Sequence, residues 1–329
     1  MAFDRFQKTL AEQAILIILA GLFLLCSLFV PSFFTARNLV NILKQSAIIG
    51  IVAAGLTVTM IAGNVDLSVG STVAFSGILA LLFTHTDFSK AFISGTSEQN
   101  AVFLALAILL PLLLGGAVGL FNGMVVTGSG ANSVIITLGA LAAVRGGALL
   151  FSDGKVIYGA HNPLFDAIGQ AQIATIPIYV FFFLVFVLLL EALLRFTTFG
   201  RSVYHIGTNL KASVIAGIPV SRVRVTTFVI CGFAAGVAAV ILAARLNSAS
   251  GTTANGWEFD AVTAVVIGGT SLFGGKGSVL GTLLGTLLVT LIINAMVLLN
   301  IPSPWQYVAK ALIIVTAVLI DVRTRKEAI

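Results

Sequence analysis

The feature that most constrains this chain is the recurrence, from one end to the other, of apolar stretches long enough to cross a bilayer. A helix needs about 20 mainly apolar residues to span the hydrocarbon layer. Here 58% of the 329 residues are hydrophobic and only 9% are charged, whereas soluble domains carry about a quarter charged residues. The sequence therefore predicts an all-α fold, a polytopic bundle of transmembrane helices.

The apolar stretches predict about ten helices, some of them short or broken. The first stretch ends without the small-residue cleavage site of a signal peptide, so we expect it to be retained. Glycine-rich breaks occur in both halves of the chain, which favours an inverted repeat. We expect residues 1–329 to form one transmembrane domain. Its predicted helices cover residues 14–30, 39–62, 67–84, 101–121, 131–151, 176–195, 224–244, 260–274, 278–299 and 305–321.

Lysine and arginine residues gather in the N-terminal tail, in the stretch after the sixth span and at the C-terminal end. With an even number of spans these segments fall on one side, which the positive-inside rule makes cytoplasmic. Both termini are therefore expected in the cytoplasm. The net charge of +6 is dispersed among the spans and forms no compact basic face. We expect contact with membrane lipid and none with nucleic acid.

Two segments interrupt the helical pattern with glycine and polar residues: 63–70 and 268–278. In hydrocarbon, broken helices are tolerated where they are buried in protein or line a wet cavity. Polar side chains in and near these segments are therefore candidates for a translocation pathway. Such groups also join membrane helices by hydrogen bonds, and for Asp66 we favour a helix cap over substrate contact. The pathway candidates are Asn64, Asp66, Ser68, Asn132, Thr137, Thr270 and Ser271.

The longest basic stretch between spans, about residues 197–222, contains the pattern of a short capped helix over 210–216. Asn209 is a favourable N-cap, Gly217 suits the left-handed residue that ends a helix, and Pro219 follows just beyond it. The helix presents small and apolar groups to the cytoplasm. Two interpretations stay open here, docking in a groove of a partner protein and resting as a connector on the lipid surface.

Three motifs occur in order along nearly the whole chain. They are Gly63-Asn64-Val65-Asp66-Leu67-Ser68-Val69-Gly70, the stretch from Gly200-Arg201 to Gly217-Ile218, and the stretch from Glu258-Phe259-Asp260 to Gly274-Gly275. Together they resemble the permease subunits of bacterial ABC importers for ribose and related monosaccharides. The resemblance implies a multi-pass protein of the bacterial inner membrane that moves a monosaccharide by alternating access.

The same resemblance implies several partners. They are two cytoplasmic ATP-binding subunits, a periplasmic sugar-binding protein, and a second permease chain in a homodimer or in a heterodimer with a sister subunit. The helix that follows Asn209 resembles the coupling helix that receives the motion of the ATPase. The residues to which the resemblance assigns this coupling are Gly200, Arg201, Gly207, Asn209, Ala212, Ile215, Ala216 and Gly217.

Two positions depart from the family pattern. Relatives usually show Pro-Phe where Asn132 and Ser133 stand, so the start of the fifth helix is expected to differ from theirs. Relatives commonly show Gly where Thr208 stands, a change that keeps the cap at Asn209. The coupling assignment is unaffected.

No pattern of catalytic residues or metal ligands is visible, so we expect a transport subunit without a cofactor and without a metal, and not an enzyme. The run around Lys276 lacks the first glycine and the hydroxyl residue of a phosphate-binding loop. ATP hydrolysis is therefore expected in a separate subunit. The histidines are scattered along the chain and give no zinc cluster.

The alternative is an ion- or proton-coupled secondary transporter of a small polar solute, which needs ionisable residues deep in several spans. Here Glu191, Lys310 and Asp321 lie near the predicted span ends. This placement favours the ATP-driven importer. The sequence leaves open which pentose, hexose or related sugar is carried.

Overall fold

A computed structural model describes residues 2–84, 97–160 and 162–326, and in these ranges the chain forms thirteen helices with two short pairs of strands. All ten predicted helices are present, and the prediction of an all-α transmembrane bundle is confirmed. The helices are α1 (Ala2–Phe29), α2 (Ala36–Ile61), α3 (Val69–Leu82), α5 (Ser97–Ser129), α6 (Ser133–Phe151), α7 (Pro163–Gln170), α8 (Ile178–Phe196), α9 (Thr198–Thr208), α10 (Leu210–Ile215), α11 (Val220–Leu246), α12 (Trp257–Ile267), α13 (Val279–Leu298) and α14 (Ser303–Lys326).

Six of these helices are long and apolar enough to cross a membrane: α2, α5, α6, α8, α11 and α13. The apolar part of α1 and the whole of α3 are shorter apolar helices. Helix α12 has 11 residues, which at about 1.5 Å per residue is roughly half the thickness of the hydrocarbon layer. The bundle therefore combines full spans with half-length helices.

The eighth predicted helix was placed too far along the chain. It was expected over residues 260–274, whereas α12 begins at Trp257 and ends at Ile267. The φ angles of Gly269 (+86°) and Gly274 (+86°) lie in the left-handed region, which a helix cannot include. The apolar residues of this stretch belong to an irregular loop, and their hydropathy alone does not distinguish the loop from a helix.

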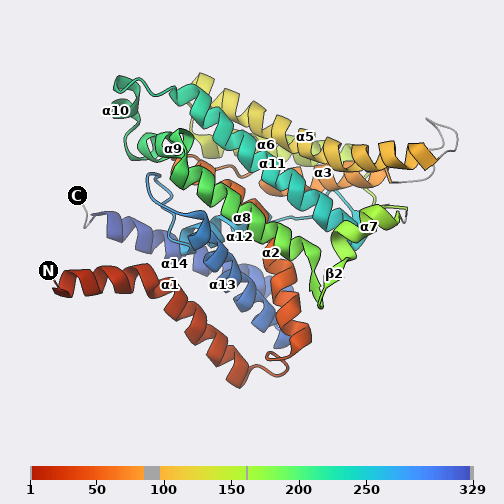
Figure 1. Ribbon diagram of the computed structural model, residues 1–329, viewed down its shortest axis with the longest axis horizontal. Helices are drawn as coiled ribbons and strands as arrows, with labels where there is room; N and C mark the ends of the chain where they lie inside the picture. Colours follow the sequence, from red (N-terminus) through yellow and green to blue (C-terminus); the bar gives the residue numbers. More distant parts are fainter. Residues whose placement is uncertain (1, 85–96, 161, 327–329) are drawn as a thin grey trace.

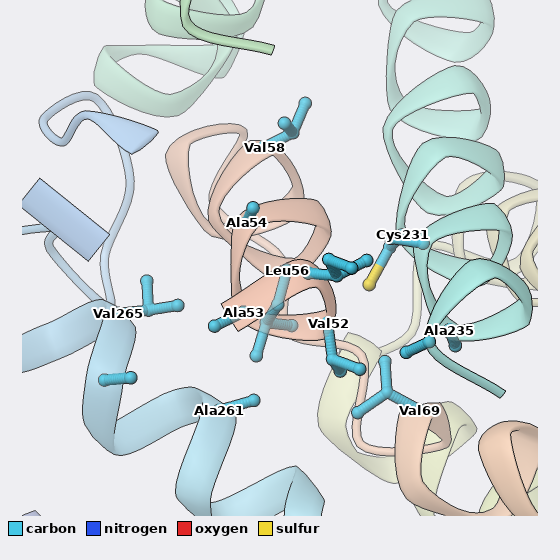
Figure 2. Close-up of a cluster of buried hydrophobic side chains, with 14 of the residues drawn as sticks. Val52, Ala53, Ala54, Leu56, Val58, Val69, Cys231, Ala235, Ala261 and Val265 are labelled. Atoms are coloured by element: carbon cyan, nitrogen blue, oxygen red, sulfur yellow. The ribbon is translucent and has the colours of Figure 1, made fainter. Parts of the chain in front are cut away.

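Helix α2 forms the centre of the core. It packs against α8, α9, α11, α12 and α13. Figure 2 shows Ala53 and Leu56 of α2 in the cluster that also contains Cys231 of α11 and Ala261 of α12, and all four are fully buried. Small side chains let several helices approach one central helix closely, so α2 is in contact with the half-length helix α12 as well as with full spans.

Helices α5 and α11 cross with their backbones in contact. Gly115, Gly119 and Gly123 lie four residues apart on α5 and so share one face. A Cβ added at Gly115 would lie 2.2 Å from the carbonyl oxygen of Gly232, and one added at Gly232 would lie 2.0 Å from that of Gly115. No side chain fits there. This small-residue contact holds α5 against the core helix α11.

The two ends of the bundle differ in what they carry. In Figure 1 the start of α1, the end of α14 and the pair α9–α10 lie toward the same end, here called the basic end. At the opposite end β1 (Ile157–Tyr158) pairs antiparallel with β4 (Ser248–Ala249), and β2 (Gln172–Ile173) pairs with β3 (Ile176–Pro177). The three basic segments of the sequence thus share one end, while the inverted repeat stays a prediction.

Candidate functional site

The basic segment after α8 folds into two short helices, each started by a side-chain cap. Thr197 accepts a hydrogen bond from the backbone N–H of Gly200 at 3.1 Å, which starts α9. Asn209 accepts one from Ala212 at 3.0 Å, which starts α10. Gly217, with φ of +76°, follows the end of α10. The short capped helix expected after Asn209 is confirmed, and it ends one residue earlier, at Ile215.

The outer face of α10 is apolar and exposed. Ile215 is 88% exposed and Val214 is 60% exposed, and the side chains of Ala212 and Ala216 are also exposed. Figure 1 shows α10 at the corner of the basic end, projecting from the body of the bundle. Within the described residues α10 packs mainly against its neighbours α9 and α11. An exposed apolar face of this kind is typical of a site that contacts another protein or a membrane.

Helix α9, in contrast, is anchored in the bundle. Val203 and Ile206 are buried, and a Cβ added at Gly200 would lie 2.1 Å from the carbonyl oxygen of Leu194, at the corner with α8. Arg201 points outward and is exposed. Because α9 is fixed to the core and α10 projects from it, a force on α10 would act on the bundle through α9.

Three backbone segments meet at the last turn of α9. They are the connection between α2 and α3 (residues 62–68), the loop between α12 and α13 (residues 268–278), and α9 at Gly207. A Cβ on Gly207 would lie 1.9 Å from the carbonyl oxygen of Ile61 and 2.4 Å from the backbone nitrogen of Gly275. A Cβ on Gly274 would lie 2.8 Å from the Cα of Gly63 and 3.0 Å from that of Gly207. We call Gly63, Gly207 and Gly274 the glycine junction.

A hydrogen bond joins two of the segments at this junction. The backbone N–H of Gly275 donates to the carbonyl oxygen of Ile61 at 2.9 Å. Tyr204 of α9 donates from its hydroxyl to the carbonyl oxygen of Gly277 at 2.9 Å. Burial raises the pKa of the Tyr204 phenol, and the nearby Glu191 carboxylate raises it further. The phenol therefore keeps the proton that it donates to the loop.

Two carboxylates hold the 268–278 loop and the start of α13. Glu191 of α8 accepts hydrogen bonds from the backbone N–H groups of Val279 at 2.7 Å and Leu280 at 3.2 Å. These amides lie in the first turn of α13, where a negative charge is favourable. Asp321 of α14 accepts from the hydroxyl of Ser271 and the N–H of Leu272, both at 3.1 Å.

Four of the predicted pathway residues lie around the 62–68 connection, and each is hydrogen-bonded to another group of the protein. Arg224 of α11 donates to the Asn64 amide oxygen at 2.7 Å. Asp66 accepts from the backbone N–H of Ser68 at 2.9 Å and from its hydroxyl at 2.7 Å. Thr137 of α6 accepts from the N–H of Leu67 at 3.1 Å. All four side chains are buried, so their polar atoms brace the connection.

Asp66 does not cap α3 as the cap interpretation expected: Ser68 occupies the N-cap position without a side-chain capping bond, and the Asp66 carboxylate accepts from the N–H of Ser68, just before the helix. The other predicted pathway residues are dispersed. Thr270 and Ser271 lie in the 268–278 loop, whereas Asn132 is exposed and caps α6 by accepting from Val134 at 2.9 Å. Whether any of them lines a pathway stays a prediction.

Sequence reasoning missed three members of this network. Asn122 of α5 donates to the Ser68 hydroxyl at 2.9 Å and is fully buried. Ser133 of α6 accepts from the N–H of Val65 at 3.1 Å, and Arg224 of α11 donates to Asn64. Asn122 stands alone among the apolar residues of its span, and that isolation was the available signal. Ser133 carried no such signal in the sequence apart from its departure from the family pattern.

No group of three or more metal-ligating side chains is found within the ranges that the structure describes. The buried polar groups of the site hold backbone segments in place, as the contacts of Glu191 and Asp66 show. The arrangement joins an exposed apolar helix to two irregular segments between helices.

Comparison with known sequences gives consistent matches over nearly the whole chain. The profile of a family described as branched-chain amino acid transport system / permease component matches residues 38–318. The chain is 35% identical to the ribose import permease protein RbsC of Haemophilus influenzae, over 95% of this chain and 94% of that protein. It is 37% identical to the ribose import permease protein RbsC of Bacillus subtilis, over 92% and 90%. It is 36% identical to the L-arabinose ABC transporter permease protein AraH of Azospirillum brasilense, over 96% and 89%. No solved structure gives a significant match.

Proposed function

The chain belongs to the permease family described as branched-chain amino acid transport system / permease component, and we propose that it is the membrane-spanning subunit of an ATP-driven importer for a monosaccharide such as ribose or L-arabinose. The observation that carries this proposal is the similarity to ribose and arabinose permeases over more than nine-tenths of the chain. Those relatives are transport components. This chain is accordingly a transport subunit of an ABC importer and not an enzyme.

A permease of this family works with an ATPase and with a substrate-binding protein. We place two ATP-binding subunits at the basic end and a sugar-binding protein at the opposite end, and we propose a second permease chain beside this one. The exposed apolar face of α10 supports the position of the ATPase, because a short apolar helix suits a groove on a partner protein. Docking is thereby preferred to the connector resting on lipid.

The chain is a multi-pass membrane protein, with six helices long and apolar enough to span. We propose that it lies in a bacterial inner membrane with the basic end in the cytoplasm. Lysine and arginine residues are concentrated in the tail, in the α9–α10 segment and at the end of α14, and such residues favour the cytoplasmic side. Both termini and α10 then face the ATPase.

The proposed mechanism is alternating access driven through the glycine junction. ATP binding would close the ATPase pair and displace α10, and α9 would carry that displacement to its last turn. There Gly207 touches the backbone of both irregular segments, so one movement reaches the 62–68 connection and the 268–278 loop together. The buried pathway candidates would act by holding these segments in one of two arrangements.

The secondary transporter is the competing function, and the buried carboxylates give it a specific observation. Asp66, Glu191 and Asp260 are all buried. Each has partners within the chain: Ser68 for Asp66, Arg195 for Glu191, and Lys310 for Asp260. These partners lie within the chain, and the near-full-length similarity to ABC permeases favours the importer.

The test is uptake of labelled monosaccharides into vesicles that contain this chain, its ATPase and its binding protein, with and without ATP at the ATPase side. We expect uptake of one sugar that requires ATP. ATP-independent uptake that collapses with an ionophore would assign the chain to the secondary transporters.

The coupling role of α10 is tested by Ala212→Arg, which puts a charged side chain on the exposed apolar face. Ala131→Arg is the control, because Ala131 is exposed just before α6 and is not part of α10. We expect Ala212→Arg to reduce ATP-driven uptake more than tenfold while membrane insertion stays normal, and the control to keep its uptake. Equal uptake by both variants would remove the coupling role.

A further inference from the structure

A cavity of about 200 Å³ lies between α2, α11, α12, α13 and α14. It is separate from the glycine junction, because none of its lining residues belongs to the 62–68 connection or to the 268–278 loop. Apolar side chains form part of its wall. The polar and aromatic residues that line it are Gln45, Arg245, Trp257, Asp260, Thr290 and Lys310.

The cavity lies partway along the central helix α2. Gln45 is nine residues from the start of α2 and sixteen from its end, which corresponds to about 14 Å and 24 Å along the helix axis. Trp257 and Asp260 lie in the first turn of the half-length helix α12. Charged side chains that face a cavity inside a membrane bundle mark candidate functional sites.

Part of the hydrogen-bonding capacity on this wall is unused. One oxygen of Asp260 accepts from the Lys310 ammonium group at 2.7 Å, but the other oxygen, Oδ1, has no partner although Asp260 is only 4% exposed. Among the described residues, the side chains of Gln45 and Arg245 also make no hydrogen bond within the chain. The wall therefore offers one buried acceptor and two sets of donors.

These groups fit a neutral polyhydroxylated ligand. A sugar hydroxyl can donate to Asp260 Oδ1 and accept from Gln45 or Arg245, while the ring of Trp257 offers an apolar surface to the C–H face of a sugar. An anion would meet the free carboxylate oxygen of Asp260, and the charge of Lys310 is already paired. The volume is below the roughly 300–1,000 Å³ of pockets for drug-sized ligands, which suits one monosaccharide.

We propose that this cavity is a transit site that holds one monosaccharide on its way through the bundle, with Asp260 and Gln45 binding hydroxyls and Trp257 covering one face of the ring. The inference rests on the proposed function. The sugar would be bound at a position that is not among the predicted pathway residues and that lies apart from the two irregular segments.

The chain offers a direct binding test because it contains two tryptophans, Trp257 and Trp305. Trp305 is 63% exposed and does not line the cavity. The variant Trp305→Phe therefore reports on the cavity alone, and Trp257→Phe is its control. In the purified chain in lipid nanodiscs, titration with ribose or L-arabinose should change the emission of Trp305→Phe saturably and leave that of Trp257→Phe unchanged. Sucrose should have no effect on either variant, and identical non-saturating changes in both would overturn the site.

A second test uses the complete importer and does not depend on how tightly the resting chain binds sugar. Gln45→Ala removes one exposed side chain that makes no bond within the protein, and Gln170→Ala is the matched control at the exposed end of α7. With saturating sugar-loaded binding protein, we expect Gln45→Ala to lower the number of sugars imported per ATP hydrolysed about threefold to tenfold, which is the effect of one hydrogen bond. The control should match the wild type.

Different outcomes would contradict the proposed function and the transit site. If the wild-type complex imports no monosaccharide with ATP, the proposed function is wrong. If the wild type imports sugar and Gln45→Ala, Thr290→Val and Asp260→Asn all keep its ratio of sugar to ATP, the importer stands and the transit site is wrong.

Discussion

Substitution of Gly207 by alanine tests the glycine junction. The added methyl group would lie 1.9 Å from the carbonyl oxygen of Ile61, well inside the 3.0 Å below which such contacts essentially do not occur. The end of α9 and the end of α2 must therefore separate by about 1 Å or more. Neither neighbour is a flexible side chain that can rotate away, because both Ile61 and Gly275 make the contact with backbone atoms.

The expected cost follows from the contacts that such a separation disturbs. Overpacking of a well-packed site costs about 1–3 kcal/mol. The bond from Gly275 N–H to the Ile61 carbonyl oxygen is made at the same atom, and loss of a buried hydrogen bond costs about 1–3 kcal/mol. The higher helix propensity of alanine offsets up to about 1 kcal/mol of this cost. We expect Gly207→Ala to lower the free energy of unfolding by about 1–6 kcal/mol.

The measurement is thermal unfolding of the purified chain in detergent, together with ATP-driven uptake by the reconstituted importer at a temperature where the variant is folded. Gly116→Ala is the control, because Gly116 lies inside α5 with nothing within 4 Å of an added Cβ. We expect Gly207→Ala to lose stability and uptake together while its ATPase subunits still hydrolyse ATP. Stability and uptake equal to those of Gly116→Ala would refute both the close contact and its part in coupling.

Two further predictions concern side chains that hold the bundle together. Glu191→Ala leaves two backbone N–H groups of α13 without their acceptor and should lower the free energy of unfolding by about 1–3 kcal/mol. Arg195→Ala, at a side chain 57% exposed, should cost at most about 1 kcal/mol. Equal losses in thermal unfolding would contradict the role assigned to the carboxylate. Asn38 and Asn294 exchange two hydrogen bonds of 2.9 Å, so a double-mutant cycle to alanine should give a coupling energy of about 0.6–1.7 kcal/mol, and additive single effects would show that the pair contributes no specific interaction.

Much of the fold was accessible from the sequence because the bilayer imposes one simple rule. Backbone polar groups must be satisfied within each span, so apolar stretches become helices and their number follows from hydropathy. The cap at Asn209 and the left-handed Gly217 were likewise predictable, since both depend on neighbours in sequence. The end of α12 was predicted less well because hydropathy does not report the φ angles of Gly269 and Gly274.

The candidate site was only partly accessible. Polar residues of the two irregular segments were recognised by type, but their partners come from distant parts of the chain. Asn122 and Arg224 reach the 62–68 connection from α5 and α11, and Asp321 reaches the 268–278 loop from α14. No spacing in the sequence predicts these pairs, because helix packing brings them together.

The sequence by itself therefore determined the class of fold, the approximate spans, the short capped helix and the resemblance to sugar permeases, all of which depend on composition, local propensity and ordered motifs. The tertiary structure decided that Gly63, Gly207 and Gly274 meet, and that Gln45, Trp257 and Asp260 line one cavity. Each of these sets combines residues more than 50 positions apart at its widest. Such neighbours are set by the close approach of packed helices, and that approach depends on all the side chains between them.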